Sequence, residues 1–130
     1  MTRDLPVPPM LRRWFDVHCV ADLLFAIPMM IAPVYTLELF GWTHVDPVTT
    51  RLVAAALIGI GVESRLGRDS DHAHFLGMLR LKVLWSGSAC LGIGWSIAQG
   101  APTMAWLFLA IFVGFNVLWT TYFLRLRRMR

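Results

Sequence analysis

An acid and an imidazole stand one helical turn apart inside the first apolar stretch of this 130-residue chain. His18 and Asp22 share one face of a helix, with Trp14 one turn earlier on the same face. Asp22 follows Arg13 by nine residues, which places it roughly 13 Å along a helix that rises about 1.5 Å per residue. Ionisable groups at that depth in a membrane mark proton relays, ion sites or ligand pockets, or else a buried pair that fixes how helices dock. The sequence leaves both alternatives open.

Polar side chains on three other apolar stretches are the expected partners of Asp22. The predicted network consists of Asp22, Glu63, Arg80, Lys82 and Asn116. Arg80 and Lys82 are about 200° apart on a helix, so one faces the protein while the other extends toward the lipid headgroups. We expect Arg80 to be the first partner of Asp22, Lys82 the second, and Asn116 a hydrogen-bonding alternative.

Cofactor chemistry has few candidates in the chain. His18, with Asp22 and Trp85, is the set that could contact a haem, a pigment or a quinone, but a second histidine on a spanning segment is missing. The run Asp69–His74 contains metal-ligand residue types, yet it falls in a turn where charged residues are expected in any case. We therefore predict no metal site, and the sequence requires no cofactor.

Catalytic signatures are not found in the sequence. It contains no Gly-x-Ser-x-Gly, no His-Glu-x-x-His, no glycine loop for phosphate and no pair of carboxylates fixed by spacing. We predict no catalytic residues and a protein that is not an enzyme.

The composition indicates the elements that hold these side chains. Hydrophobic residues make up 57% of the chain and charged residues 15%, against about 25% charged in soluble domains. Four stretches approach the roughly 20 residues that a spanning helix needs. They are residues 14–33, 47–64, 75–98 and 103–124. The prediction is an all-α integral membrane protein, with residues 1–130 as one domain folded as an antiparallel four-helix bundle.

Between the first two stretches, residues 35–40 form either a short interfacial helix closed by Gly41 or a plain loop. The sequence favours neither.

Basic residues predict the orientation. Eleven of the twelve lie at one membrane face, and only Arg51 lies at the other. By the positive-inside rule both termini are cytoplasmic, in what we expect to be a bacterial cytoplasmic membrane. The net charge of +4 follows from this asymmetry and needs no nucleic-acid partner. Tryptophans are expected at the two interfaces, with Trp14 and Trp119 at the inner one.

Small residues recur every four positions on three of the stretches, a spacing that lets helices approach closely in lipid. The predicted helix-packing residues are Ala55, Gly59, Ser86, Cys90, Gly94, Ala98, Ala110 and Gly114. On the third stretch, Ser88, Gly92 and Ser96 repeat the spacing on another face. Two such faces suggest a central helix that touches two neighbours, or one neighbour and a second protein.

Several segments resemble the small bacterial four-helix membrane proteins of the DoxX-like group. They are Ile31-Ala32-Pro33, Leu39-Phe40-Gly41-Trp42, the passage from Asp46 into the Ala- and Gly-rich residues 54–61, and Leu79-Arg80-Leu81-Lys82. The resemblance implies a cytoplasmic-membrane protein that accompanies a redox or envelope complex. It implies no catalytic residues.

Small size and the lack of a catalytic set predict a non-catalytic accessory or assembly subunit of a larger membrane complex. Its expected partners are the lipid bilayer and either other membrane subunits or further copies of the chain. Two alternatives stay open. One is a redox-associated subunit that binds quinone, haem or pigment, and the other is a small proton-coupled transporter.

Overall fold

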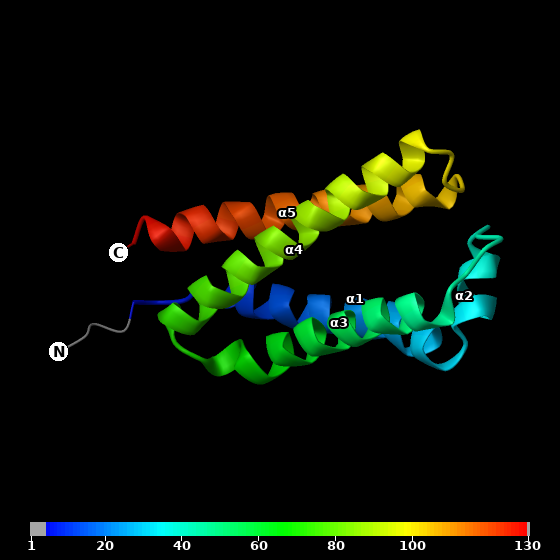
Figure 1. Ribbon diagram of the computed structural model, residues 1–130. Helices are drawn as coiled ribbons and strands as arrows, with labels where there is room; N and C mark the ends of the chain where they lie inside the picture. Colours follow the sequence, from blue (N-terminus) through cyan, green and yellow to red (C-terminus); the bar gives the residue numbers. More distant parts are fainter. Residues whose placement is uncertain (1–4, 130) are drawn as a thin grey trace. The chain divides into compact units, whose positions relative to one another are not determined.

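The computed structural model describes residues 5–129, and within that range the chain is helical without a strand (Figure 1). The helices are α1 (Pro9–Ile31), α2 (Pro33–Leu39), α3 (Pro47–Leu66), the 3₁₀ turn η1 (Gly67–Asp69), α4 (His72–Ala98) and α5 (Met104–Arg127). All of these except α2 and η1 are long and apolar enough to cross a membrane. The chain is therefore all-helical with four candidate spanning helices, as its composition predicts.

The first helix begins earlier than the apolar pattern indicates. It starts at Pro9, because a proline is tolerated in the first helical turn, where its missing N–H would have no partner. The helix ends at Ile31, and Pro33 opens α2, so the alternative of a short helix after the first span is the correct one. Gly41 follows with φ 95°, a left-handed conformation that glycine adopts without strain and that ends a helix.

The second spanning helix, α3, has an acidic N-cap. The carboxylate of Asp46 accepts hydrogen bonds from the Val48 backbone N–H at 2.8 Å and from the Thr49 hydroxyl at 2.9 Å. These bonds favour the ionised form and lower the pKa of Asp46, the backbone bond contributing most. The cap therefore stabilises the folded protein fully when the pH is above the ordinary pKa of aspartate. This stabilisation is lost as the pH falls through the pKa of Asp46 in the folded protein, which is lower.

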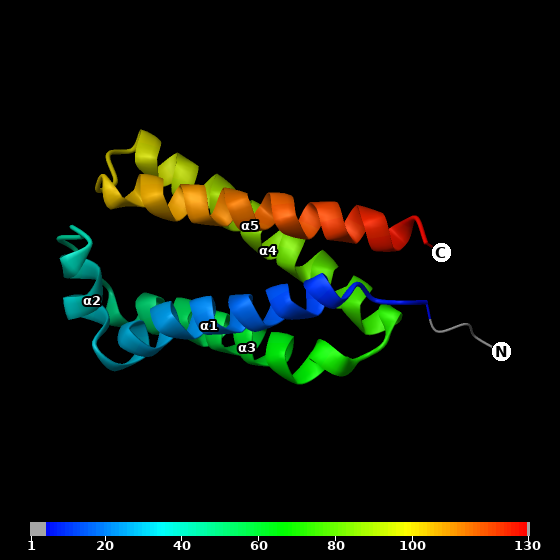
Figure 2. The same cartoon turned by 180° about the vertical axis from the view of Figure 1, so that it is seen from behind.

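The last two helices form an antiparallel hairpin. Asp71 caps α4 by accepting from the His74 backbone N–H at 2.8 Å, so this helix begins at His72, before the purely apolar part. At its other end Gly100, with φ 91°, turns the chain into α5. The two helices lie side by side in both views (Figures 1 and 2).

The chain divides into two compact units. One is Arg12–Arg68, called here the α1–α3 unit, and the other contains Asp69–Arg130 with the start of the chain, called the α4–α5 unit. Within the first unit, α1 and α3 run antiparallel beside each other (Figure 2). Each unit thus holds two of the four candidate spans.

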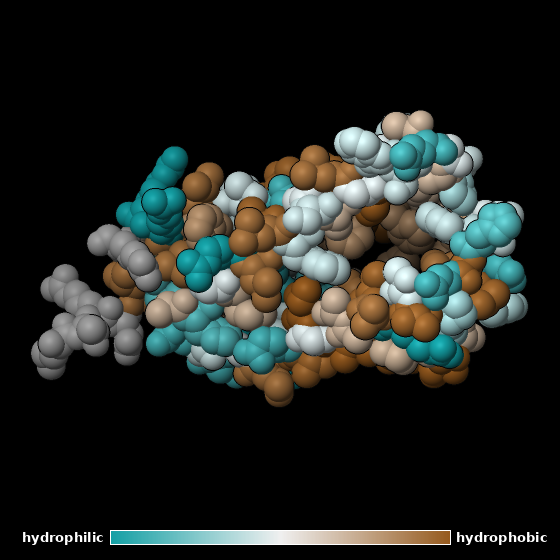
Figure 3. All heavy atoms as spheres, viewed as in Figure 1, coloured by the Kyte–Doolittle hydropathy of each residue, from teal (hydrophilic) through white to brown (hydrophobic). Residues whose placement is uncertain are grey.

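Apolar side chains cover much of the surface (Figure 3). Leu91 is 78% exposed and Trp95 72%, both on the second half of α4. In water such a surface would mark a large interaction site, whereas a spanning helix presents it to lipid tails. The buried residues of α4 gather instead in its first half, on one stripe: His72, Phe75, Leu76, Met78, Leu79, Lys82 and Ser86.

Candidate functional site

The His18–Asp22 pair lies buried on the inner side of α1. Both side chains are less than a tenth exposed, and His18 Nδ1 lies 3.0 Å from Asp22 Oδ2. Despite that short distance, Oδ2 makes no hydrogen bond of good geometry to any of residues 5–129. The four-residue spacing predicts this arrangement of the pair. The Oδ2 atom of Asp22 can still accept a hydrogen bond.

Gly61 of α3 explains how Asp22 fits between two helices. A Cβ atom built on Gly61 would lie 2.8 Å from Asp22 Cβ and 3.2 Å from Asp22 Oδ2. Real Cβ atoms do not approach that closely, so only glycine lets the α3 backbone lie against the acid. Gly61 was not among the residues predicted to pack helices, although it follows Gly59 by two positions.

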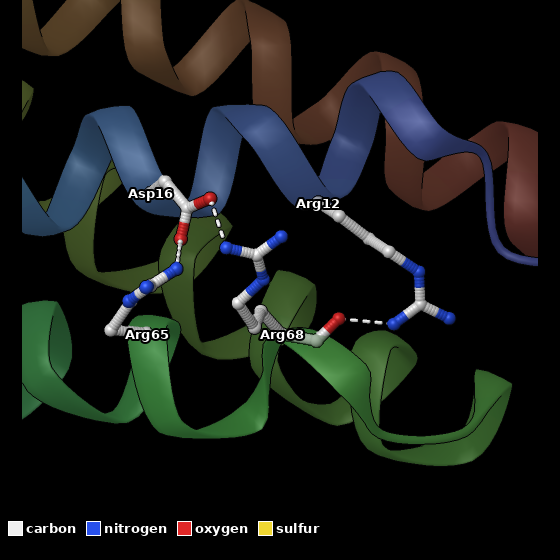
Figure 4. A network of polar contacts seen from close by, with 4 residues as sticks. All are labelled: Arg12, Asp16, Arg65 and Arg68. Carbon is white, nitrogen blue, oxygen red and sulfur yellow. Dashed lines mark hydrogen bonds and ion pairs between the residues drawn. The ribbon is translucent and has the colours of Figure 1, made fainter.

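A cluster of four charged residues joins the start of α1 to the end of α3 (Figure 4). Asp16 Oδ1 lies 2.7 Å from Arg65 Nη1, and Asp16 Oδ2 lies 2.8 Å from Arg68 Nη1. The Arg12 guanidinium donates to the backbone carbonyl of Arg68. Because Arg65 is 54% exposed, each ion pair contributes modestly, about 0–1 kcal/mol.

The sequence does not reveal this cluster. Its arginines count there only toward the membrane orientation, and no pattern gives Asp16 a partner. The available signal was topological: an acid near the start of one helix and a basic group at the end of the next share a membrane face when the two helices are antiparallel.

In the α4–α5 unit, Asn116 ties the two helices together. Its Nδ2 atom donates to the Val83 carbonyl at 3.0 Å and to Ser86 Oγ at 2.9 Å. Ser86 Oγ in turn donates to the Lys82 carbonyl at 2.7 Å. A Cβ on Gly87 would lie 3.4 Å from Asn116 Nδ2, so this glycine also marks a close approach. Hydrogen bonds of this kind fix helix register within a membrane.

Lys82 is the buried base of α4. It is 1% exposed, and its Nζ atom lies 5.0 Å from the centre of the Trp119 ring, within reach of a cation–π interaction. Arg80, by contrast, is exposed, and which of these two bases compensates Asp22 stays a prediction. The buried stripe of α4 explains the difference in exposure, since Leu79, Lys82 and Ser86 share it and Arg80 does not.

Trp119 is likewise not an interfacial tryptophan. It is fully buried, and its ring stacks on Phe115 with ring centres 5.7 Å apart. The expectation that it lies in the inner aromatic belt is wrong, because α5 turns this residue toward the protein.

The remaining members of the predicted network are distributed over both units. Glu63 is exposed on α3, in the unit of Asp22. Lys82 and Asn116 belong to the other unit, as does Trp85, which is half-buried. A single network that joins all of these residues, and a cofactor contact that uses His18, Asp22 and Trp85 together, stay predictions.

Most of the predicted small-residue positions are exposed in the part of the chain that the structure describes. They are Ala55, Gly59, Ala98, Ala110 and Gly114. A Cβ built on Gly59, Gly94 or Gly114 would meet no heavy atom of the described chain within 4 Å. On α4, Ser86 is buried, and Cys90 and Gly94 are half-buried. Helix packing at the exposed positions, against another helix of this chain or a second protein, stays a prediction.

The run Asp69–His74 is expected in a turn, but its two histidines lie in the first turn of α4, and one of them has a structural role. His72 is buried, and its Nε2 atom lies 3.1 Å from the Leu126 carbonyl, which joins the start of α4 to the end of α5. Over residues 5–129, no group of three or more His, Cys, Asp or Glu side chains is placed to hold a metal ion.

These features define the class of the protein: an all-helical chain with four helices long and apolar enough to span a membrane, and with several ionisable side chains buried among its helices. Comparison with protein-family models, with curated proteins and with solved structures finds no match for this chain.

Proposed function

We propose that this chain is a non-catalytic membrane subunit, an accessory or assembly component of a larger membrane complex. The observation that carries the proposal is the uncovered face of α3 at Ala55 and Gly59, where added side-chain atoms at Gly59 would meet open space in the described chain. Small-residue faces let helices approach closely in lipid, where apolar surface alone gives no drive to associate. A face of this kind suits a helix of another membrane subunit or of a second copy.

The polar groups of the α4–α5 unit also support a structural role, because they make contacts between the two helices. Asn116 is bonded to Val83 and Ser86, and Lys82 lies over Trp119. Such contacts stabilise one arrangement of helices, which is the task of a scaffold.

The proposal includes the topology and location. The four spans form one antiparallel bundle in a bacterial cytoplasmic membrane, with both termini in the cytoplasm. The supporting pattern is in the sequence: of the twelve basic residues, only Arg51 lies next to the connection between the first two apolar stretches, and the other eleven lie near the termini or the connection between the second and third stretches. The resemblance to the DoxX-like group favours a place beside a redox or envelope complex.

Co-purification from native membranes in mild detergent tests the subunit role. The wild-type chain is expected to elute with a partner or as an oligomer, and Gly59→Leu is expected to reduce that association several-fold, because a bulky side chain blocks close approach. Leu91→Phe is the control on α4, because it enlarges a side chain that is 78% exposed and lies outside the small-residue faces. It should leave association unchanged. A wild-type chain that elutes alone as a monomer would contradict the proposal.

A second candidate function is proton-coupled transport, favoured by the leftover accepting capacity of Asp22 Oδ2 next to an imidazole. Buried acids of spanning helices serve as proton carriers in many pumps and transporters.

Asp22→Asn separates the two candidate functions. If the acid and His18 form a structural pair, the substitution should lower the free energy of unfolding by about 1–3 kcal/mol, because it disturbs a buried polar pair. The measurement is equilibrium unfolding in detergent micelles, with Asp46→Asn on the exposed cap as the control. Unchanged stability, together with loss of proton uptake by vesicles containing the protein, would favour transport instead.

A further inference from the structure

An open hollow with a mixed lining lies along the last turns of α5. Its volume is about 390 Å³, and it is lined by Thr121, Leu124, Arg125 and Arg128. All four residues are exposed and lie on one face of the helix, since their spacings of three, four and seven place them one or two turns apart. Hydrophilic residues gather at this end of the molecule, near the C terminus (Figure 3).

Two guanidinium groups set the charge of the hollow. Arg125 and Arg128 are three residues apart, so both project over the same part of the helix surface. Guanidinium groups bind phosphate oxygens through two parallel hydrogen bonds, which makes arginine suited to phosphate recognition. The negative end of the α5 helix dipole also lies here and disfavours an anion. Binding of an anion at this place therefore requires the positive charges of the two arginines.

The same face becomes apolar toward the middle of the membrane. Leu124 is 44% exposed, and Val117, seven residues earlier on the same face, is 60% exposed. A cationic end followed by an apolar stripe matches a phospholipid, whose phosphate lies at the surface while its acyl chains run inward. Free phosphate would use the arginines alone.

Thr121 lies four residues before Arg125, about 6 Å closer to the middle of the membrane, beside the part of the hollow that is apolar. Its hydroxyl donates to the Val117 carbonyl at 2.8 Å, so this polar group is satisfied within the helix.

From this arrangement we propose that the hollow binds the phosphate of an anionic phospholipid such as phosphatidylglycerol. Arg125 and Arg128 hold the phosphate, and an acyl chain lies along Leu124 and Val117. A choline headgroup adds a cation that the two arginines repel, so a lipid without net charge binds less well. The site is independent of the proposed subunit role and of the His18–Asp22 pair.

Lipid titration of the purified full chain in mild detergent tests this site, followed by the rise of the thermal unfolding midpoint that a bound ligand produces. The probes are dioctanoyl phosphatidylglycerol, dioctanoyl phosphatidylcholine and inorganic phosphate. The first should stabilise the wild type saturably. The other two should bind about tenfold or more weakly, because each lacks either a net negative charge or the apolar chain.

The double variant Arg125→Gln/Arg128→Gln should weaken phosphatidylglycerol binding by about tenfold or more. Arg127→Gln removes the same kind of charge from an exposed position outside the hollow and should change binding by less than about twofold. The double variant Arg125→Lys/Arg128→Lys keeps the charge, loses the fork geometry and should give an intermediate affinity. If the glutamine variant fails to fold, the affinity of this lysine variant is compared with that of the wild type instead.

Equal binding of the two lipids by the wild type would overturn the proposal, and so would an equal loss in Arg127→Gln. Inorganic phosphate that binds as tightly as phosphatidylglycerol would show a phosphate site without lipid selectivity, which also overturns it.

Discussion

Trp119→Ala is expected to lower the free energy of unfolding by about 3–5 kcal/mol, the usual effect of truncating a fully buried tryptophan. Trp119 is 0% exposed, its ring stacks on Phe115, and Lys82 Nζ lies 5.0 Å from the ring centre. Truncation leaves a cavity at the contact of α4 and α5. It also takes the aromatic face away from a buried cation, so loss of packing and loss of cation–π attraction act in the same direction.

Trp106→Ala is the matched control, because Trp106 lies on the same helix and is 60% exposed. Its effect should stay below about 1 kcal/mol, as is usual for exposed positions. Trp119→Phe should fall between the two variants, since it keeps an aromatic face in a smaller volume. The measurement is equilibrium unfolding in mixed micelles with increasing denaturing detergent. Equal effects of Trp119→Ala and Trp106→Ala would show that the buried position of Trp119 is wrong.

The spanning helices could be predicted from the sequence because length and hydropathy decide them. Prolines and glycines that start or end helices bound these stretches, such as Pro47 at the start of α3 and Gly100 after α4. The helix after the first span could not be decided. Its seven residues, Pro33–Leu39, are too few for a periodic pattern to stand out from a loop.

The faces of the helices were harder to predict than their bounds. In water, polar residues identify the outer face of a helix, but a spanning helix is apolar on both sides, so that signal is weak. The spacing of Arg80 and Lys82 predicted that they point apart but left open which one faces inward. Gly59 and Gly61 present the same difficulty, since both are small residues on α3 and only one has a neighbour.

The polar site could be predicted where its contacts are local in sequence. His18 and Asp22 are four residues apart, and the helix itself brings them together. The pairs of Asp16 with Arg65 and Arg68 span about fifty residues, and no local pattern encodes them. Such contacts depend on how two helices pack, which hydropathy does not specify.

Gly61→Ala is expected to destabilise the α1–α3 unit by about 1–3 kcal/mol, the range for overpacking a close contact. The added methyl group would lie 2.8 Å from Asp22 Cβ, a backbone-proximal atom that no rotamer change can move away. The two helices must separate, or the acid must shift. Either change disturbs the 3.0 Å approach of Asp22 to His18.

Gly59→Ala provides the control on the same helix, two residues earlier. An added Cβ there meets no described atom within 4 Å, so the substitution should be neutral or slightly stabilising through higher helix propensity. Unfolding of both variants in detergent micelles gives the comparison. If the two substitutions have equal effects, α3 does not lie against Asp22. If Gly61→Ala alone destabilises and its cost becomes smaller in the Asp22→Gly background, the clash is with the Asp22 side chain, because only glycine removes the Cβ atom that the new methyl group would meet.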